Sequence, residues 1–263
     1  MEEGHRGHPT NVPVMPVRAV DLHCHLLPGV DDGPATMDES VAYARAAVAA
    51  GTGTIVATPH VEQVDVRTIP ERVAEVRAAL ASEGIDLEVV PGGELKPASI
   101  PDLDAEELEI LAHGPAGARW LLYEVPFIGV DDAFLDGAEE LRARGYGLLL
   151  AHPERSRGFL EHGHELLDPL VQAGSLFAVN VGPLTGHEKV ERTEAARHLA
   201  ENGLVHLVAT DAHPPSRPYQ LLDAAPYVPR SAFTAVPARV LAEGIGGYKA
   251  GVCGDGARDS PLP

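Results

Sequence analysis

Seven short, nearly continuous apolar runs alternate with helix-like segments along the chain. The runs cover residues 17–22, 54–58, 87–90, 120–123, 147–151, 176–179 and 205–209. One strand and one helix recur about every 30 residues, which is the repeat of a parallel βα unit. Continuous apolar runs indicate strands that are buried on both faces. The pattern predicts an α/β fold whose seven parallel strands form a barrel with one unit fewer than the usual eight.

Helix signals fall between these runs. Thr36 followed by Glu39, and Thr68 followed by Glu71, match the capping box that begins a helix. Further helices are expected over 104–112, 132–144, 165–173 and 188–201. No linker interrupts the pattern, so we predict a single domain over 17–248, a disordered leader over 1–16 and a flexible tail over 249–263.

Charge and cysteine content restrict the class of protein. The formal net charge is −19, which repels phosphate backbones and argues against a nucleic-acid partner. Cys24 and Cys253 form no disulfide framework, so a reducing compartment is expected. Membrane insertion is not expected, because no apolar run approaches the roughly 18 residues of a membrane span. The start of the chain lacks the apolar segment of a secretory signal, and we therefore predict a cytoplasmic protein.

Potential metal ligands follow almost every predicted strand. Singly, each has a structural explanation, such as a loop histidine, a helix cap or a hydrogen-bonded core histidine. The carboxyl ends of parallel strands, however, all meet at one end of a barrel. We therefore predict one metal site made of nine residues, which are His23, His25, Asp32, His60, Glu94, Glu124, His152, Asp211 and His213. Imidazole nitrogen and carboxylate oxygen together suit Mn, Fe or Zn better than Ca, and nine such ligands are enough for three ions.

Six motifs, in this order, resemble the polymerase and histidinol phosphatase (PHP) superfamily. They are DLHCHLLPGVDDG at 21–33, ATPH at 57–60, GGE at 92–94, YEVPF at 123–127, AHPER at 151–155 and ATDAH at 209–213. Within the superfamily they are most similar to the metal-dependent protein-tyrosine phosphatases of Gram-positive capsule and exopolysaccharide loci. The resemblance implies a distorted (β/α)7 TIM-like barrel with a trinuclear metal centre. It also implies hydrolysis of phosphotyrosine by a metal-bound hydroxide, without a phosphoenzyme.

The resemblance further implies a role for each residue. One ion would be held by His23, His25 and Asp211, a second by Glu124 and His152 with Glu94 bridging the two, and a third by Asp32, His60 and His213. Mn²⁺ is the ion that the resemblance favours, with Fe, Zn, Mg and Co as alternatives. Arg155 and Arg217 resemble the phosphate-binding arginines, and Arg157 is a substitute for Arg155.

The partner implied by the resemblance is a phosphotyrosine protein, such as the tail of a membrane-associated tyrosine kinase that regulates capsule or exopolysaccharide synthesis. Neither the resemblance nor the residues indicate an oligomeric state.

Rival functions make different demands on the same residues. A cysteine phosphatase needs arginine six residues after its cysteine, but Val30 follows Cys24 at that spacing, and Cys24 should face away from His23 and His25. Amidohydrolases usually carry a bridging lysine where this chain has Glu124, and TatD-like nucleases tend to end in a TDxP pattern. Histidinol-phosphate phosphatase, or another small-molecule phosphoesterase, is the alternative within the superfamily. A non-catalytic, metal-stabilised interaction module would be expected to lack some of the ligands.

Overall fold

The computed structural model describes residues 18–214, 217 and 219–245. The predicted leader over 1–16 and tail over 249–263 lie outside these residues, and the single domain over 17–248 stays a prediction. In the described part of the chain, no helix combines the length and apolar character needed to cross a membrane.

Within the described residues, eight strands pair in parallel to form two sheets. The first sheet has the order β1-β2-β3, formed by Ala19–Cys24, Thr52–Ala57 and Glu88–Pro91. The second has the order β4-β5-β6-β7-β8, formed by Glu94–Leu95, Trp120–Glu124, Gly147–Ala151, Leu176–Asn180 and Leu207–Ala209.

Two isolated bridges join the sheets into a closed ring. His60 pairs with Glu94 on one side, and Cys24 pairs with Ala212 on the other. Beside the second bridge, the amide of Asp211 donates to the carbonyl of His23 at 2.9 Å. Closure pairs the edges that two open sheets would expose, and the ring is therefore a barrel.

Gly92 and Gly93 separate β3 from β4 and let the chain pass from one sheet to the other. A Cβ at Gly93 would lie 2.5 Å from Leu111, and one at Gly92 would lie 2.8 Å from both His113 and Val56, so only glycine fits without a shift. Counted as one bent strand, β3 and β4 complete seven βα units. The predicted distorted (β/α)7 barrel is confirmed.

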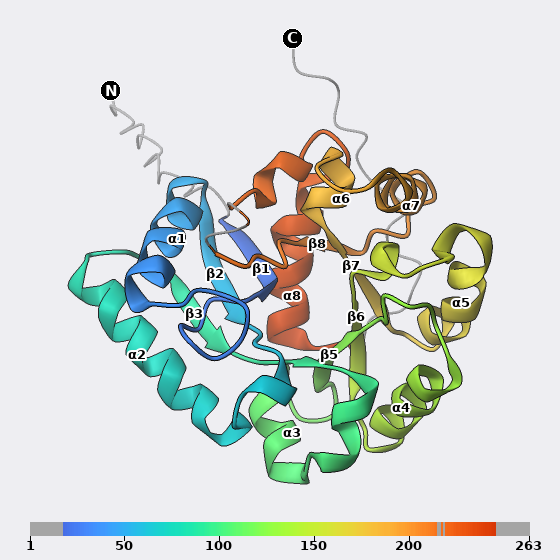
Figure 1. Ribbon diagram of the computed structural model, residues 1–263, viewed down its shortest axis with the longest axis horizontal. Coiled ribbons are helices and arrows are strands. Elements are labelled where there is room, and N and C mark those ends of the chain that lie inside the picture. The colour runs from blue at the N-terminus through green and yellow to red at the C-terminus, as the bar shows by residue number, and fades with distance from the viewer. Residues whose placement is uncertain (1–17, 215–216, 218, 246–263) are drawn as a thin grey trace, which may run out of the picture.

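Most helices surround the ring of strands, as Figure 1 shows. The α-helices of the described residues are α1 (Met37–Ala49), α2 (Ile69–Ser82), α3 (Ala105–Leu111), α4 (Asp132–Ala143), α5 (His164–Gln172), α6 (Val181–Thr185), α7 (Val190–Glu201) and α8 (Ala235–Glu243), of which α8 does not lie on the outside. The sequence patterns did not predict α6, nor the π-helical turn at Phe159–Gly163 that precedes α5.

The helix caps differ in part from the predicted ones. Thr36 accepts a hydrogen bond from the amide of Glu39, as expected at the start of α1. Thr68 makes no such cap, because its hydroxyl donates to the carbonyl of Asp65, so the second predicted capping box is wrong. A complete capping box instead forms between Asp104 and Glu107 at the start of α3.

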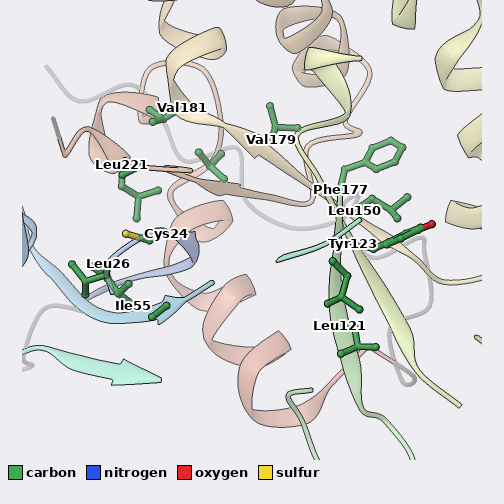
Figure 2. Close-up of a cluster of buried hydrophobic side chains, with 14 of the residues drawn as sticks. Cys24, Leu26, Ile55, Leu121, Tyr123, Leu150, Phe177, Val179, Val181 and Leu221 are labelled. Carbon is green, nitrogen blue, oxygen red and sulfur yellow. The ribbon is translucent and has the colours of Figure 1, made fainter. Parts of the chain in front are cut away.

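Two apolar layers line the two faces of the strands. The outer layer packs against the surrounding helices and includes Leu121, Tyr123, Leu150, Phe177 and Val179 (Figure 2). The inner layer fills the barrel and includes Trp120, Leu122, Leu149, Leu176 and Ala178. Alternate residues of β5, β6 and β7 thus face opposite layers, which is why these strands read as continuous apolar runs.

Helix α8 covers the end of the barrel at which the strands begin. Trp120, the first residue of β5, donates from its indole Nε1 to the carbonyl of Val240 in α8 at 2.9 Å. Val240 and Ile245 pack in the inner layer, and Figure 1 shows α8 in the middle of the ring. Because an apolar helix closes this end, a polar site can form only at the carboxyl ends of the strands.

Candidate metal centre

The first two predicted ligands are both fully buried, His23 in β1 and His25 directly after it. Leu22 packs in the inner layer, whereas Cys24 packs in the outer layer, so the alternation of the strand changes between them. The pairing of β1 with β2 is irregular between Asp21 and Cys24. This irregularity turns both imidazoles toward the mouth of the barrel, where their Nε2 atoms lie 3.4 Å apart.

Glu94 lies at the centre of the cluster, on the short strand β4. Its Oε2 is 3.4 Å from Nε2 of both His23 and His25 and 3.1 Å from Nδ1 of His60. Its Oε1 is 2.9 Å from Nε2 of His152. One buried carboxylate therefore contacts four imidazoles from three different segments, as a bridging ligand would.

Asp32 and His213 form the outermost part of the cluster. Oδ1 of Asp32 lies 3.1 Å from Nε2 of His213 and 3.5 Å from Nε2 of His60. The side chain of Asp32 is 64% exposed, so this part of the cluster faces the solvent from which a substrate would enter.

Three groups of side chains could each hold a metal ion, because their ligand atoms lie within 4.8 Å of one another. The groups are His23, His25 and Glu94; His60, Glu94 and Glu124; and His25, Asp32, His60 and His213. Oδ1 of Asp211 is 3.6 Å from Nε2 of both His23 and His25. All nine predicted ligands thus lie in one cluster at the carboxyl ends of the strands.

The structure differs most from the implied ligand roles in the residues assigned to the second ion. Glu124 groups with Glu94 and His60, whereas its Oε1 is 3.9 Å from Nε2 of His152. The division of the nine residues among ions therefore stays a prediction.

Two of the clustered residues have backbone conformations that are rare outside glycine. His152 has φ 37° and Asp211 has φ 46°, both in the left-handed region. Such residues persist only where the surroundings hold them, and they concentrate at functional sites. The strain lies where β6 and β8 end and the chain has to point a ligand into the mouth.

Acid and base groups within the cluster shift one another's pKa. Burial lowers the pKa of His25, but its hydrogen bond with Asp31 and its contact with the Glu94 carboxylate outweigh burial and raise the pKa to about 10. Burial and the neighbouring Glu94 carboxylate raise the pKa of Glu124 to about 7. The mouth is thus a place where like and opposite charges are held together away from water.

Several buried polar atoms here have no hydrogen-bond partner. They are Nδ1 of His23, Nδ1 of His60, Oε2 of Glu94, Oε2 of Glu124 and Nδ1 of His152. Leaving one such atom unpaired costs about 1–3 kcal/mol, so a group of them in one cluster indicates an additional partner. Carboxylate and imidazole atoms suit divalent Mn, Fe or Zn, and the residues present therefore fit a metal centre.

Both predicted arginines reach the cluster through Asp211. Nη1 of Arg155 lies 2.5 Å from Oδ2 of Asp211, and Nη1 of Arg217 lies 3.1 Å from the same oxygen. Arg217 also donates to the backbone carbonyl of Asp211 at 2.7 Å. Arg157, by contrast, is exposed, and its backbone amide donates to Phe127.

Sequence reasoning missed three residues of this region. Oδ2 of Asp31 accepts a hydrogen bond from Nδ1 of His25 at 2.7 Å, and Asn180 donates to Oδ2 of Asp211 at 2.8 Å. Phe127 lies against His152, with ring centroids 5.2 Å apart. Asn180 ends a predicted strand, so the rule that selected the other residues would have found it if amides had been considered.

Cys24 lies where the sequence predicted, away from the metal cluster. It packs in the outer apolar layer with Leu26, Ile55 and Leu221 (Figure 2). Burial raises its pKa well above the usual value, which disfavours the thiolate that a cysteine nucleophile needs.

Comparison with known proteins gives one family. The family model for capsular polysaccharide synthesis, CpsB/CapC, matches residues 19–243. The tyrosine-protein phosphatase YwqE of Bacillus subtilis is 33% identical over 198 residues, 74% of this chain and 77% of that protein. The putative tyrosine-protein phosphatase CapC of Staphylococcus aureus is 27% identical over 209 residues, 77% of this chain and 80% of that protein.

A solved structure agrees with these relatives. It comes from the crystal structures of YwqE from Bacillus subtilis and CpsB from Streptococcus pneumoniae, named as metal-dependent tyrosine phosphatases. It superposes with a TM-score of 0.71 and 31% identity, over 84% of this chain and 93% of that chain. The similarity therefore extends over the barrel and the strand ends that carry the cluster.

Proposed function

This chain belongs to the CpsB/CapC family of capsular polysaccharide synthesis, and from that membership we propose that it is a metal-dependent protein-tyrosine phosphatase. One observation carries the proposal. Nine nitrogen and oxygen ligands and two arginines meet at the open end of the barrel, around Glu94 and Asp211. The resemblance to tyrosine phosphatases drawn from the six motifs agrees with the family and with its named relatives.

The proposed centre uses all nine ligands. Glu94 would join two ions, since its two oxygens face different sets of histidines. Divalent ions held there would polarise the phosphoryl oxygens and acidify water for attack on phosphorus. We take Mn²⁺ as the native metal and up to three ions per chain, with Fe, Zn, Mg and Co as the alternatives to test.

Arg155 and Arg217 would bind the phosphate group. Their guanidinium groups converge on one oxygen of Asp211 at the edge of the cluster, and Arg155 is nearly buried. Guanidinium forks form charge-assisted, bidentate hydrogen bonds with phosphate oxygens and stabilise negative charge as it develops there. Asn180, which donates to the same oxygen of Asp211, would keep that carboxylate in place.

The leaving group suits this arrangement. Tyrosine has a pKa of about 10, so its phenolate needs less protonation on leaving than an alkyl alkoxide does. The proposal therefore requires no general acid at the ester oxygen. The substrate we propose is a phosphotyrosine protein, such as the tail of a membrane-associated tyrosine kinase, with the enzyme in the cytoplasm.

The test combines metal content with turnover on one purified sample of the full chain. Mn, Mg, Fe, Zn and Co are added separately to chelated protein, and phosphate release is measured from a phosphotyrosine peptide and from histidinol phosphate. Two to three bound ions with Mn-restored release from the peptide would support the proposal. Release from histidinol phosphate alone would assign the protein to small-molecule hydrolysis. If no metal bound and no metal restored activity, the metal centre itself would be contradicted.

A further inference from the structure

Phe127 lies beside the proposed centre, on the loop between β5 and α4. It follows Glu124 by three residues, and its ring centroid is 5.2 Å from that of His152. The guanidinium carbon of Arg155 lies over the ring, 4.5 Å from its centroid. Phe127 therefore contacts both a proposed metal ligand and a proposed phosphate-binding residue.

The ring of Phe127 contacts two residues of the proposed centre and is nevertheless exposed to solvent. Phe127 is 42% exposed, although a phenyl ring normally gains by burial. A second arginine, Arg192 of α7, has its guanidinium carbon 5.9 Å from the centroid of the ring and is itself paired with Glu188 at 3.0 Å. Although these two arginines lie near the ring and can form cation–π contacts with it, part of its apolar surface stays open to solvent.

The backbone around Phe127 is held in place. The carbonyl of Phe127 accepts from the amide of Arg157 at 3.0 Å, and the carbonyl of Pro126 accepts from the hydroxyl of Ser156 at 2.8 Å. These hydrogen bonds tie the loop after β5 to the segment that carries Arg155. The distance between the phenyl ring and the phosphate-binding arginine is thus set by the fold.

We propose that Phe127 contacts the phenyl ring of the substrate and so makes the site selective for aryl over alkyl phosphates. This inference rests on the proposed phosphatase function. A phosphate bound at Arg155 places its ester oxygen, and the group attached to that oxygen, close to the side chain stacked on Arg155. An aryl group there meets an exposed aromatic edge or face, whereas a short alkyl group does not reach it.

The expected size of the effect follows from aromatic pairs in general. Such a pair contributes about 0.5–1.5 kcal/mol beyond burial, which corresponds to about two- to tenfold in binding or in kcat/KM. A purely structural role for Phe127, in holding His152 or Arg155, would instead lower activity on every phosphate ester by the same factor. The ratio between aryl and alkyl substrates therefore separates the two roles.

The test uses the metal-loaded full chain with Phe127→Leu, Phe127→Tyr and the control Ile128→Ala. Ile128 is the neighbouring apolar residue, 76% exposed, and serves as a matched surface change in the same loop. The ratio of kcat/KM for p-nitrophenyl phosphate to that for β-glycerophosphate is measured for each variant. Phe127→Leu should lower this ratio about two- to tenfold, while Phe127→Tyr and Ile128→Ala should keep the wild-type ratio.

A binding measurement makes the result independent of turnover. Phenylphosphonate and methylphosphonate share the phosphonate group and differ in the aryl ring, and their affinities can be compared by calorimetry. Wild type should prefer the phenyl compound, and Phe127→Leu should lose that preference. Equal loss for both compounds, or an unchanged preference, would overturn the inference. Failure of the phosphatase proposal would be a different result, namely no phosphate release by wild type with any added metal.

Discussion

Buried histidines lie at both ends of the barrel, and their neighbours are different. At the end where strands begin, the ring of His113 packs at a tilt of 37° against Trp120 with ring centroids 4.8 Å apart, and His206 accepts from the amide of Phe177 at 3.0 Å. At the end where strands finish, His25 contacts the carboxylates of Asp31 and Glu94. Histidine is thus a packing residue at one end of the barrel and a candidate metal ligand at the other.

The pKa values of His113, His206 and His25 follow this difference. Burial lowers the pKa of His113 to about 4, and burial does the same for His206. At the opposite end, acidic partners overcome burial and raise the pKa of His25 to about 10. Burial still lowers the pKa of His152 and His213 in the same cluster, so the nearby carboxylates, and not the pKa of each histidine, distinguish the candidate metal site from the apolar core.

The largest expected effect comes from removing the central carboxylate. Glu94→Ala should lower phosphatase activity by more than about a hundredfold and reduce the bound metal, because Glu94 would join two ions. Metal analysis and kcat/KM on a phosphotyrosine peptide measure both quantities. Glu88→Ala is the matched control, since Glu88 is an exposed glutamate at the start of β3, and its side chain accepts a hydrogen bond from the hydroxyl of Thr54. Activity of Glu94→Ala within about threefold of wild type would contradict the bridging role.

A smaller effect is expected at the arginines. Arg155→Lys keeps the charge but loses the guanidinium fork, so kcat/KM should fall about ten- to a hundredfold with the metal content unchanged. Steady-state kinetics and metal analysis of the same sample test this. Arg157→Lys should stay within about twofold of wild type, because Arg157 is exposed and outside the cluster. A loss in Arg157→Lys with Arg155→Lys unchanged would instead assign phosphate binding to Arg157.

A change at the opposite end should affect stability and leave the site intact. The pKa of His113 is about 4 in the folded chain and about 6.5 for an exposed histidine of the unfolded chain, so below pH 6.5 the unfolded chain binds a proton that the folded chain does not. Stability that His113 supports at neutral pH is therefore lost as the pH falls from about 6.5 to about 4.

His113→Gln should accordingly reduce the loss of unfolding free energy between pH 7 and pH 5 by about 2 kcal/mol. Urea unfolding of metal-free protein at the two pH values measures this, and turnover of the metal-loaded variant should stay within about twofold. Adding His206→Gln should weaken the pH dependence further, because burial lowers the pKa of His206 as well. A loss of bound metal in His113→Gln would remove the distinction between the two ends.

Cys24→Ser should likewise leave turnover nearly unchanged. Cys24 stands between two proposed ligands in the sequence but packs in the outer apolar layer, so turnover per folded molecule should stay within about threefold of wild type. Stability should fall by about 1–3 kcal/mol, because a hydroxyl group replaces a buried thiol. A loss of more than about a hundredfold in folded protein would indicate thiol chemistry, despite the position of the side chain.

Local patterns predicted most of the elements but not all of their ends. The prediction of a capping box at Thr68 was wrong because the hydroxyl of Thr68 donates to the carbonyl of Asp65 and does not cap the helix. The turn α6 was missed because five residues containing glycine and proline carry no helical periodicity. Both errors arise where one or two hydrogen bonds outweigh the propensity of a short segment.

The sequence by itself determined the order of the βα units and the chemical type of each strand end. Apolar runs of buried strands and polar residues that follow them are local features, so His23, Glu94 and His152 could be selected without coordinates. Only the tertiary structure decided which atoms meet. The bridge between His60 and Glu94, the irregularity in β1 and the left-handed backbone of His152 and Asp211 depend on strand register and barrel closure.

Those features join residues that are far apart in the chain, and no local pattern records the distance between them. The same holds for Arg155 on Phe127, a contact made across two loops. Residue type follows from local burial and chemistry, whereas the geometry of the site follows from how seven βα units close into one ring.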